Sequence, residues 1–142
     1  VQRHPDTVII VTTNNDYAGC KPLNQSVISR MNLVIDLDEP DEDTLVERVL
    51  GITGCKEKKL VLNMARSVHS ITEYCRANLI LDGCCGVREL IAWVQSYMIC
   101  KNIHEAADYT ILSSVTSDME SRLEVESNCV DPYYGMQEGS GI

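Results

Sequence analysis

The pattern of apolar residues changes near Pro40. Before that point, residues 7–13 are a β-branched run that is apolar at four successive positions, and residues 33–37 (LVIDL) are a second, mostly apolar run. Continuous apolarity of this kind is typical of strands that are buried on both faces of a sheet. Between the two runs, residues 22–31 fit a short helix, because proline is favoured in a first helical turn. Residues 1–39 therefore predict a strand, a helix and a second strand, which together form the end of an α/β unit.

After Pro40 the apolar residues recur at intervals of three and four, which is the period of an amphipathic helix. The acidic residues 41–43 favour a helix start there, because negative charge is stabilised at the positive end of a helix dipole. The pattern predicts helices from near residue 41 to the glycines at 51 and 54, and over about 57–79, 87–101, 103–114 and 118–128.

These elements predict a mostly α fold in three parts. A strand–helix–strand segment occupies residues 1–39, and a bundle of four to five helices occupies residues 40–128. The remaining residues, 129–142, are expected to form a flexible tail, because positions 132–142 include three glycines and are nearly free of aliphatic residues until the last one.

Composition and charge narrow the function classes. The chain has 142 residues, of which 44% are apolar and 23% charged, and this suits one domain or a small domain with part of another. A formal net charge of −9 disfavours nucleic-acid binding, because phosphate contacts need clustered Lys and Arg. No apolar run approaches the roughly 18 residues of a membrane helix, and no secretory leader opens the chain.

The seven cysteines do not form a recognisable metal or disulfide pattern. None of them forms a CxxC pair, and the chain has three histidines, whereas a closed zinc site uses four ligands at short paired spacings. We therefore expect no metal site. Reduced, mostly buried thiols and a cytoplasmic location are the simplest interpretation.

Three sequence motifs occur in an order that resembles a known family. HPDTVIIVTTNN at 4–15 resembles the strand that carries the sensor-one residue of AAA+ nucleoside triphosphatases, in the MoxR-like and dynein-related group. NQSVISRM at 24–31 resembles the segment that carries the arginine finger of that family, although Met31 replaces the usual Phe. GVRELIAWV at 86–94 resembles the start of the lid helix with its sensor-two arginine, although Cys84 and Cys85 precede it where Ser or Pro is frequent.

The resemblance implies a role for three residues. Asn14, with Asn15 as its rival, would orient the attacking water beside the γ-phosphate of ATP, and Arg30 would reach the nucleotide of a neighbouring subunit. Arg88 would bind nucleotide phosphate and report its state to the helical lid. Taken without the resemblance, these residues fit a turn, a cation at a helix end and a solvated surface residue.

The resemblance covers the back half of such an ATPase. The chain lacks a G-x-x-x-x-G-K-[ST] phosphate loop and an apolar strand ending in Asp-Glu, both of which precede the sensor-one strand in the family. The full-length parent would bind ATP and Mg²⁺, assemble into a ring of identical subunits, expected to be hexameric, and act on a protein client. This fragment alone is expected to be inactive and to hold no tightly bound cofactor.

Without the front half, residues 1–39 would lose the neighbouring strand of their sheet. We therefore expect them to be rearranged, paired between chains or held by a partner. A second interpretation is a non-enzymatic helical interaction module whose acidic surface binds a basic partner. A redox or metal-linked cysteine protein is a third and more distant one.

Overall fold

The computed structural model describes residues 2, 4–13, 24–38, 40–78 and 85–134. The chain divides into two compact units, residues 1–38 and residues 39–142, which we call the N-terminal unit and the helical unit. All regular secondary structure in the described ranges is helical. The expected mostly α fold is therefore confirmed, whereas its two strands are not.

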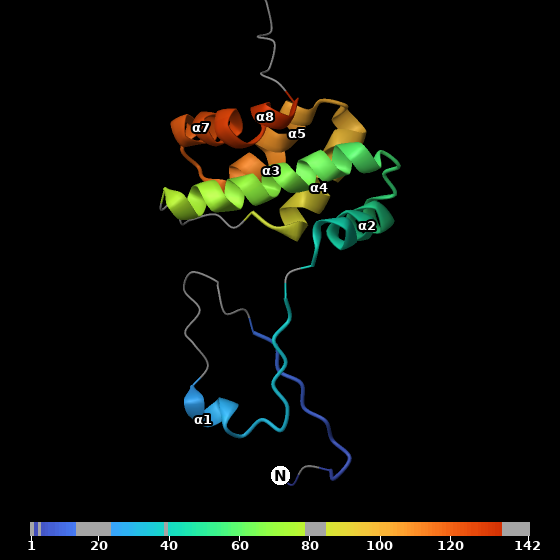
Figure 1. The fold of residues 1–142 in the computed structure, drawn as a ribbon, viewed down its shortest axis with the longest axis vertical. Coiled ribbons are helices and arrows are strands. Elements are labelled where there is room, and N and C mark those ends of the chain that lie inside the picture. Colours follow the sequence, from blue (N-terminus) through green and yellow to red (C-terminus); the bar gives the residue numbers. More distant parts are fainter. Residues whose placement is uncertain (1, 3, 14–23, 39, 79–84, 135–142) are drawn as a thin grey trace, which may run out of the picture. The chain divides into compact units, whose positions relative to one another are not determined.

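In the N-terminal unit, neither predicted strand forms: residues 7–13 and 33–37 have neither helical nor strand hydrogen bonding. Figure 1 shows both as elongated stretches of chain. A strand exists only when a neighbouring strand satisfies its backbone groups, and no described residue supplies that partner. The strand prediction is therefore wrong for the described residues: apolar, β-branched runs favour strands, but without a pairing partner they form none.

A single short helix is described in this unit. Helix α1, Gln25–Ile28, begins at Asn24, whose side-chain oxygen accepts a hydrogen bond of 3.1 Å from the backbone N–H of Ser26. It is shorter than the predicted helix over 22–31, of which residues 22 and 23 lie outside the described part.

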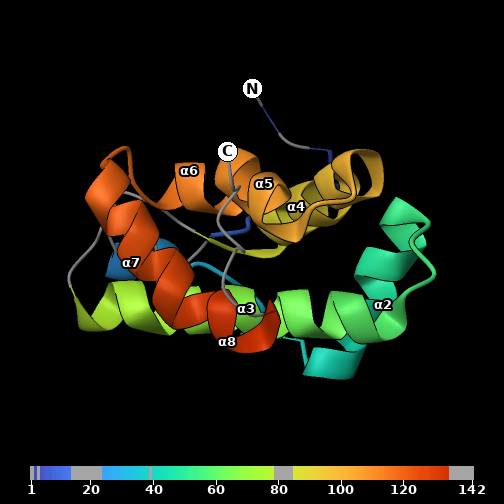
Figure 2. The same cartoon turned by 90° about the horizontal axis from the view of Figure 1, so that it is seen from above.

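The helical unit follows the predicted order of helices. They are α2 (Glu42–Thr53), α3 (Lys58–Ala77), α4 (Val87–Cys100), α5 (Ile103–Ala107), the π-helical turn η1 (Asp108–Leu112), α6 (Ser113–Val115), α7 (Met119–Cys129) and α8 (Asp131–Tyr134). Figure 2 shows α3 as the longest helix, with α2 beside one end and α7 lying over the other. The 3.6-residue period was therefore a reliable guide after Pro40.

Helix ends are set by local side-chain chemistry. Asp41 and Asp118 begin α2 and α7, and each accepts a hydrogen bond from the backbone N–H three residues later. Gly54 ends α2 with a left-handed φ of 73°, which glycine adopts without steric cost. Gly51, which was also predicted to end this helix, lies inside it.

Two predictions in the C-terminal third need correction. The helix expected over 103–114 is interrupted by η1, where the Thr110 hydroxyl donates a hydrogen bond of 2.6 Å to the carbonyl of Ala106. The tail expected from 129 starts later, because Cys129 and Val130 are buried and α8 follows them. The buried side chains of Cys129 and Val130 hold this segment in the core, although its composition suggested a flexible tail.

The core of the helical unit surrounds Trp93 on α4, which is fully buried. Its indole Nε1–H donates a hydrogen bond of 2.9 Å to the carbonyl of Ile103, and its ring meets Tyr134 edge-on at 6.1 Å between centroids. The Tyr134 hydroxyl in turn donates to the carbonyl of Leu60 at 3.1 Å. Other large side chains in this core are Met64, Ile71, Leu90, Ile111 and Leu112.

Four of the five described cysteines are buried: Cys55, Cys75, Cys85 and Cys129. Burial raises the pKa of the Cys75 and Cys129 thiols, which disfavours the reactive thiolate. The expectation of mostly buried thiols is confirmed for these positions, whereas Cys20 and Cys84 lie outside the described residues. No helix in the described part of the chain is long and apolar enough to cross a membrane.

Leu90 and Ile99 offer a matched test of this core, because both lie on α4 but Leu90 is fully buried and Ile99 is 85% exposed. We expect Leu90→Ala to lower the free energy of unfolding by about 2–5 kcal/mol, through lost apolar contacts and a cavity. Ile99→Ala should change it by less than about 0.5 kcal/mol. Urea unfolding followed by circular dichroism measures both values, and equal losses would contradict this core.

The capping aspartates predict a pH dependence. Hydrogen bonds from Thr44 hold the pKa of Asp41 below its usual 3.8, and those from Ser121 do the same for the pKa of Asp118. Because the folded-state pKa values are depressed, their contribution to stability is present above the unfolded value and is lost as pH falls through the folded one. The free energy of unfolding should therefore fall between about pH 5 and pH 3, and should fall less in an Asp41→Asn, Asp118→Asn double variant.

Urea titrations at a series of pH values measure this slope. The matched control is Asp36→Asn, which removes an exposed carboxylate outside the helices and should keep the wild-type slope. An unchanged slope in the double variant would show that other carboxylates carry the acid sensitivity.

Candidate functional site

The structure describes two of the three residues that the sequence singled out. Arg30 is exposed in the turn that follows α1, and Arg88 is exposed in the first turn of α4. Asn14 and its rival Asn15 lie outside the described residues. Since Arg30 and Arg88 belong to different units, each is placed only within its own unit.

The start of α4 is anchored to α3, which fixes the backbone of Arg88. Thr72 on α3 donates its hydroxyl to the carbonyl of Cys85 at 3.0 Å, and the N–H of Gly86 donates to Glu89 Oε2 at 2.8 Å. The guanidinium of Arg88 therefore extends from a fixed helix start, where the helix dipole adds partial positive charge. Glu89 reduces that positive potential and occupies one of the N–H groups that an anion could use.

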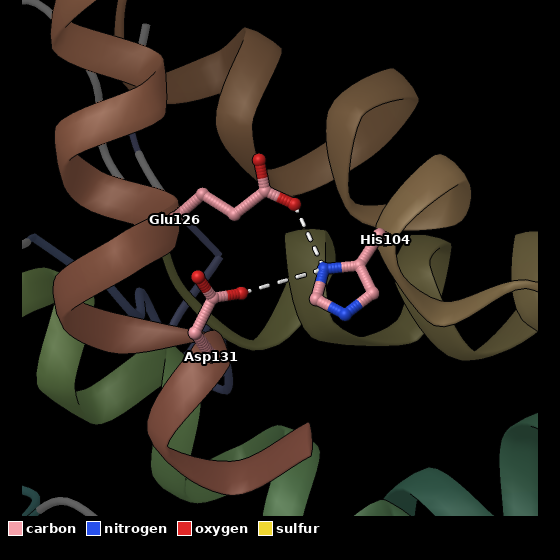
Figure 3. Close-up of side chains that lie close together, drawn as sticks. All are labelled: His104, Glu126 and Asp131. Atoms are coloured by element: carbon pink, nitrogen blue, oxygen red, sulfur yellow. Dashed lines mark hydrogen bonds and ion pairs between the residues drawn. The ribbon is translucent and has the colours of Figure 1, made fainter. Parts of the chain in front are cut away.

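A second group of polar side chains meets inside the helical unit. His104 on α5, Glu126 on α7 and Asp131 at the start of α8 converge, as Figure 3 shows. His104 Nδ1 lies 2.8 Å from Glu126 Oε1 and 3.7 Å from Asp131 Oδ1. Their side chains are only 11%, 17% and 15% exposed. We call this group the His–Glu–Asp cluster.

Neighbouring contacts hold each member in place. The side chain of Asn102 accepts a hydrogen bond from the backbone N–H of Glu105 and so caps the start of α5. The indole N–H of Trp93 donates a hydrogen bond to the carbonyl of Ile103, the residue before His104. On α7, the buried residues Val125 and Cys129 flank Glu126 and fix the face on which it lies. The same core that stabilises the bundle therefore positions the His–Glu–Asp cluster.

One hydrogen bond joins members of the cluster, between His104 and Glu126. An ionised carboxylate only accepts hydrogen bonds, so the 2.8 Å contact requires a proton on His104 Nδ1 that is donated to Glu126. Asp131 Oδ1, at 3.7 Å, is too far for a second hydrogen bond from that nitrogen. One nitrogen and two carboxylates are also a donor set that could hold a metal ion.

Sequence reasoning missed this cluster because its members are 22 and 5 residues apart. Such gaps do not resemble the short paired spacings by which metal sites are recognised. Asp131 also lay in the segment assigned to the tail. The one available signal was the apolar pair Cys129 and Val130, which shows that the chain is still packed just before Asp131.

Comparison of the chain with known protein-family models, with curated proteins and with solved structures finds no match.

The contact between His104 and Glu126 can be tested with a double-mutant cycle of His104→Ala and Glu126→Ala. We expect a coupling energy of about 1–3 kcal/mol, because this pair is largely buried and each single change leaves a charged or polar partner behind. The matched control is the 3.1 Å pair of Arg76 and Glu73, whose side chains are 62% and 56% exposed.

This control pair should couple by about 0.5 kcal/mol or less, because water screens exposed ion pairs. Urea unfolding of the four proteins in each cycle, in the presence of a chelator, measures both energies. A coupling energy for His104 and Glu126 no larger than the control would contradict a structural role for the contact.

Proposed function

We propose that this chain forms the C-terminal half of a AAA+ ATPase of the MoxR-like and dynein-related group. In the full-length parent, ATP and Mg²⁺ bind at interfaces between the subunits of a ring, expected to be hexameric. Hydrolysis there drives the remodelling of a client protein or the insertion of its cofactor. Residues 1–38 would complete the α/β core, and the helical unit would be the lid.

The observation that carries this proposal is the exposure of two apolar runs in the N-terminal unit. In the first run, the side chains are 54–83% exposed, and in the second they are 61–89% exposed. The residues are Val8, Ile9, Ile10 and Val11, followed by Leu33, Val34, Ile35 and Leu37. Chains rarely leave such runs in water, so these residues favour burial against further protein.

The residue types of these runs favour a sheet as their partner. Val and Ile are enriched in strands, and continuous apolarity fits a strand covered on both faces. A central strand that ends in the phosphate loop would pair with both runs and bring its nucleotide to their ends. Asn14 directly follows the first run, and Arg30 precedes the second, as sensor-one and arginine-finger roles require.

The helical unit supports the proposal through Arg88. Its guanidinium is exposed at a helix start that α3 holds in place, where it can meet a phosphate that approaches from outside the unit. Movement of the lid would then bring Arg88 toward or away from the nucleotide. The described part of the helical unit contains more and shorter helices than the four to five expected, so both its identity as a lid and the role of Arg88 are part of the proposal.

The first test is the coding sequence over about 100–150 residues upstream of Val1, the span that the missing half would need. We expect a phosphate loop there, followed by an apolar strand that ends in acidic residues. A start codon close to Val1 would contradict the ATPase and favour the helical interaction module with an acidic surface.

The mechanistic test uses the full-length parent. Arg30→Ala should lower kcat for ATP hydrolysis by about 10³-fold or more and leave ATP binding intact, because a finger acts on the developing charge of the transition state. Arg88→Ala should weaken ATP binding, and Asn14→Ala should lower kcat. The matched control is Arg48→Ala, an exposed arginine on α2, which should have wild-type kcat.

Mixed rings identify the subunit in which Arg30 acts. Subunits with Arg30→Ala are mixed with subunits whose phosphate-loop lysine is replaced, and neither kind hydrolyses ATP alone. If Arg30 reaches a neighbouring nucleotide, the mixture should regain hydrolysis at interfaces that combine an intact finger with an intact phosphate loop. A mixture as inactive as its components would contradict action on a neighbouring nucleotide, and Arg30→Ala subunits that hydrolyse ATP alone would exclude a catalytic role for Arg30.

A further inference from the structure

We propose that the His–Glu–Asp cluster is a binding site for a divalent transition-metal ion, with Zn²⁺ as the best match. The ligands would be Nδ1 of His104 and one carboxylate oxygen each of Glu126 and Asp131. This inference rests on the interior of the helical unit and does not depend on the proposed ATPase function.

The first argument is the spacing of the donor atoms. Zn²⁺ binds nitrogen and oxygen at about 2.0–2.2 Å, so neighbouring ligand atoms of a tetrahedral site lie about 3.3–3.5 Å apart. The distances of 2.8 and 3.7 Å from His104 Nδ1 to the two carboxylates lie on either side of that value. All three donor atoms lie within 4.8 Å of one another. Rotation of the two carboxylate side chains would have to bring the donor atoms to about 3.3–3.5 Å from one another, which would place them at three corners of a tetrahedron.

The second argument is charge. Two largely buried carboxylates face one imidazole, and a single Nδ1–H cannot hydrogen-bond both of them. The basic residue on α7, Arg122, is directed elsewhere: it donates to the carbonyl of Thr116 at 2.8 Å and pairs with Asp108 at 3.5 Å. Helices α5 and α8 contain no Lys or Arg. A divalent cation would neutralise the two carboxylates.

The third argument is the chemistry of the donors. Imidazole nitrogen suits Zn²⁺ and its neighbours in the first transition row, whereas Mg²⁺ and Ca²⁺ prefer oxygen ligands throughout. The side chains are 11–17% exposed, so solvent reaches the cluster and water could supply the fourth ligand. The ligands come from α5, α7 and α8, so the ion would tie the end of the chain to the bundle.

Metal binding requires one proton to move. In the metal-free site Nδ1 carries the proton that is donated to Glu126, and its lone pair must become available to the ion. A neutral ring achieves this when its proton moves to Nε2, and a charged ring achieves it when Nδ1 releases its proton to solvent. Either way, the carboxylate of Glu126 exchanges its hydrogen bond for a bond to the metal.

The test is a titration of the full chain with Co²⁺, which reports its ligands by absorption. We expect saturation at one equivalent, with visible bands of a tetrahedral site and without the near-ultraviolet band of thiolate ligation, because the chain also contains cysteines. Zn²⁺ should displace Co²⁺ and raise the Tm. Glu126→Gln and Asp131→Asn should each weaken binding by at least about tenfold, because each removes an anionic ligand.

Two control variants remove the same chemical groups elsewhere. His69→Gln changes an exposed histidine on α3, and Glu105→Gln changes an exposed carboxylate next to His104. Both should bind Co²⁺ with wild-type affinity. Circular dichroism checks that each variant is helical. His104→Gln removes the third ligand, and if that variant does not fold, the loss of binding in Asp131→Asn tests the site.

Three outcomes would overturn the proposal: no saturable binding, a thiolate band at saturation, or wild-type affinity in both Glu126→Gln and Asp131→Asn. In each of them the cluster would be an ion-pair network and nothing more. Loss of binding in the cluster variants, with binding retained in the controls, would establish the site.

Discussion

The helical unit depends on the contacts of one side chain, the indole of Trp93. Because the ring is fully buried, its N–H must find a partner, and it finds one in the carbonyl of Ile103 at the start of α5. Its edge-on contact with Tyr134 holds α8, and the hydroxyl of Tyr134 reaches the first turn of α3 through Leu60. Four helices are thereby joined through a single aromatic pair.

The position of the His–Glu–Asp cluster follows from these contacts. His104 is the residue next to Ile103, so the hydrogen bond from the indole fixes the turn from which the imidazole extends. Asp131 opens the short helix that Tyr134 closes, so the same aromatic contact holds its carboxylate near the ring. Burial of the neighbours of Glu126 completes the arrangement. Apolar packing therefore fixes the backbone positions from which the three polar side chains extend toward one another.

Sequence predicted the helical unit well because each of its signals is local. These signals are the 3.6-residue apolar period, the capping aspartates and the left-handed Gly54. Each acts within a few residues of the chain, and together they predict the ends of the longer helices to within about two residues. Contacts between distant residues were not predictable in this way. The cluster joins His104 to Glu126 across 22 residues, and α8 is stabilised by the contact of Tyr134 with Leu60, 74 residues away. Short helices of this kind have little intrinsic stability, so composition alone described them as a tail.

The helical unit forms regular structure and the apolar runs of the N-terminal unit do not, because helices and strands satisfy their backbone hydrogen bonds in different ways. A helix satisfies its own backbone and needs only an apolar neighbour, which the helical unit supplies from within. A strand needs the backbone of another strand, and residues 7–13 and 33–37 have no such partner among the described residues. Their apolar side chains are exposed, and water is an unfavourable environment for them. The exposure of these side chains is the physical basis of the proposal that further protein completes a sheet with them.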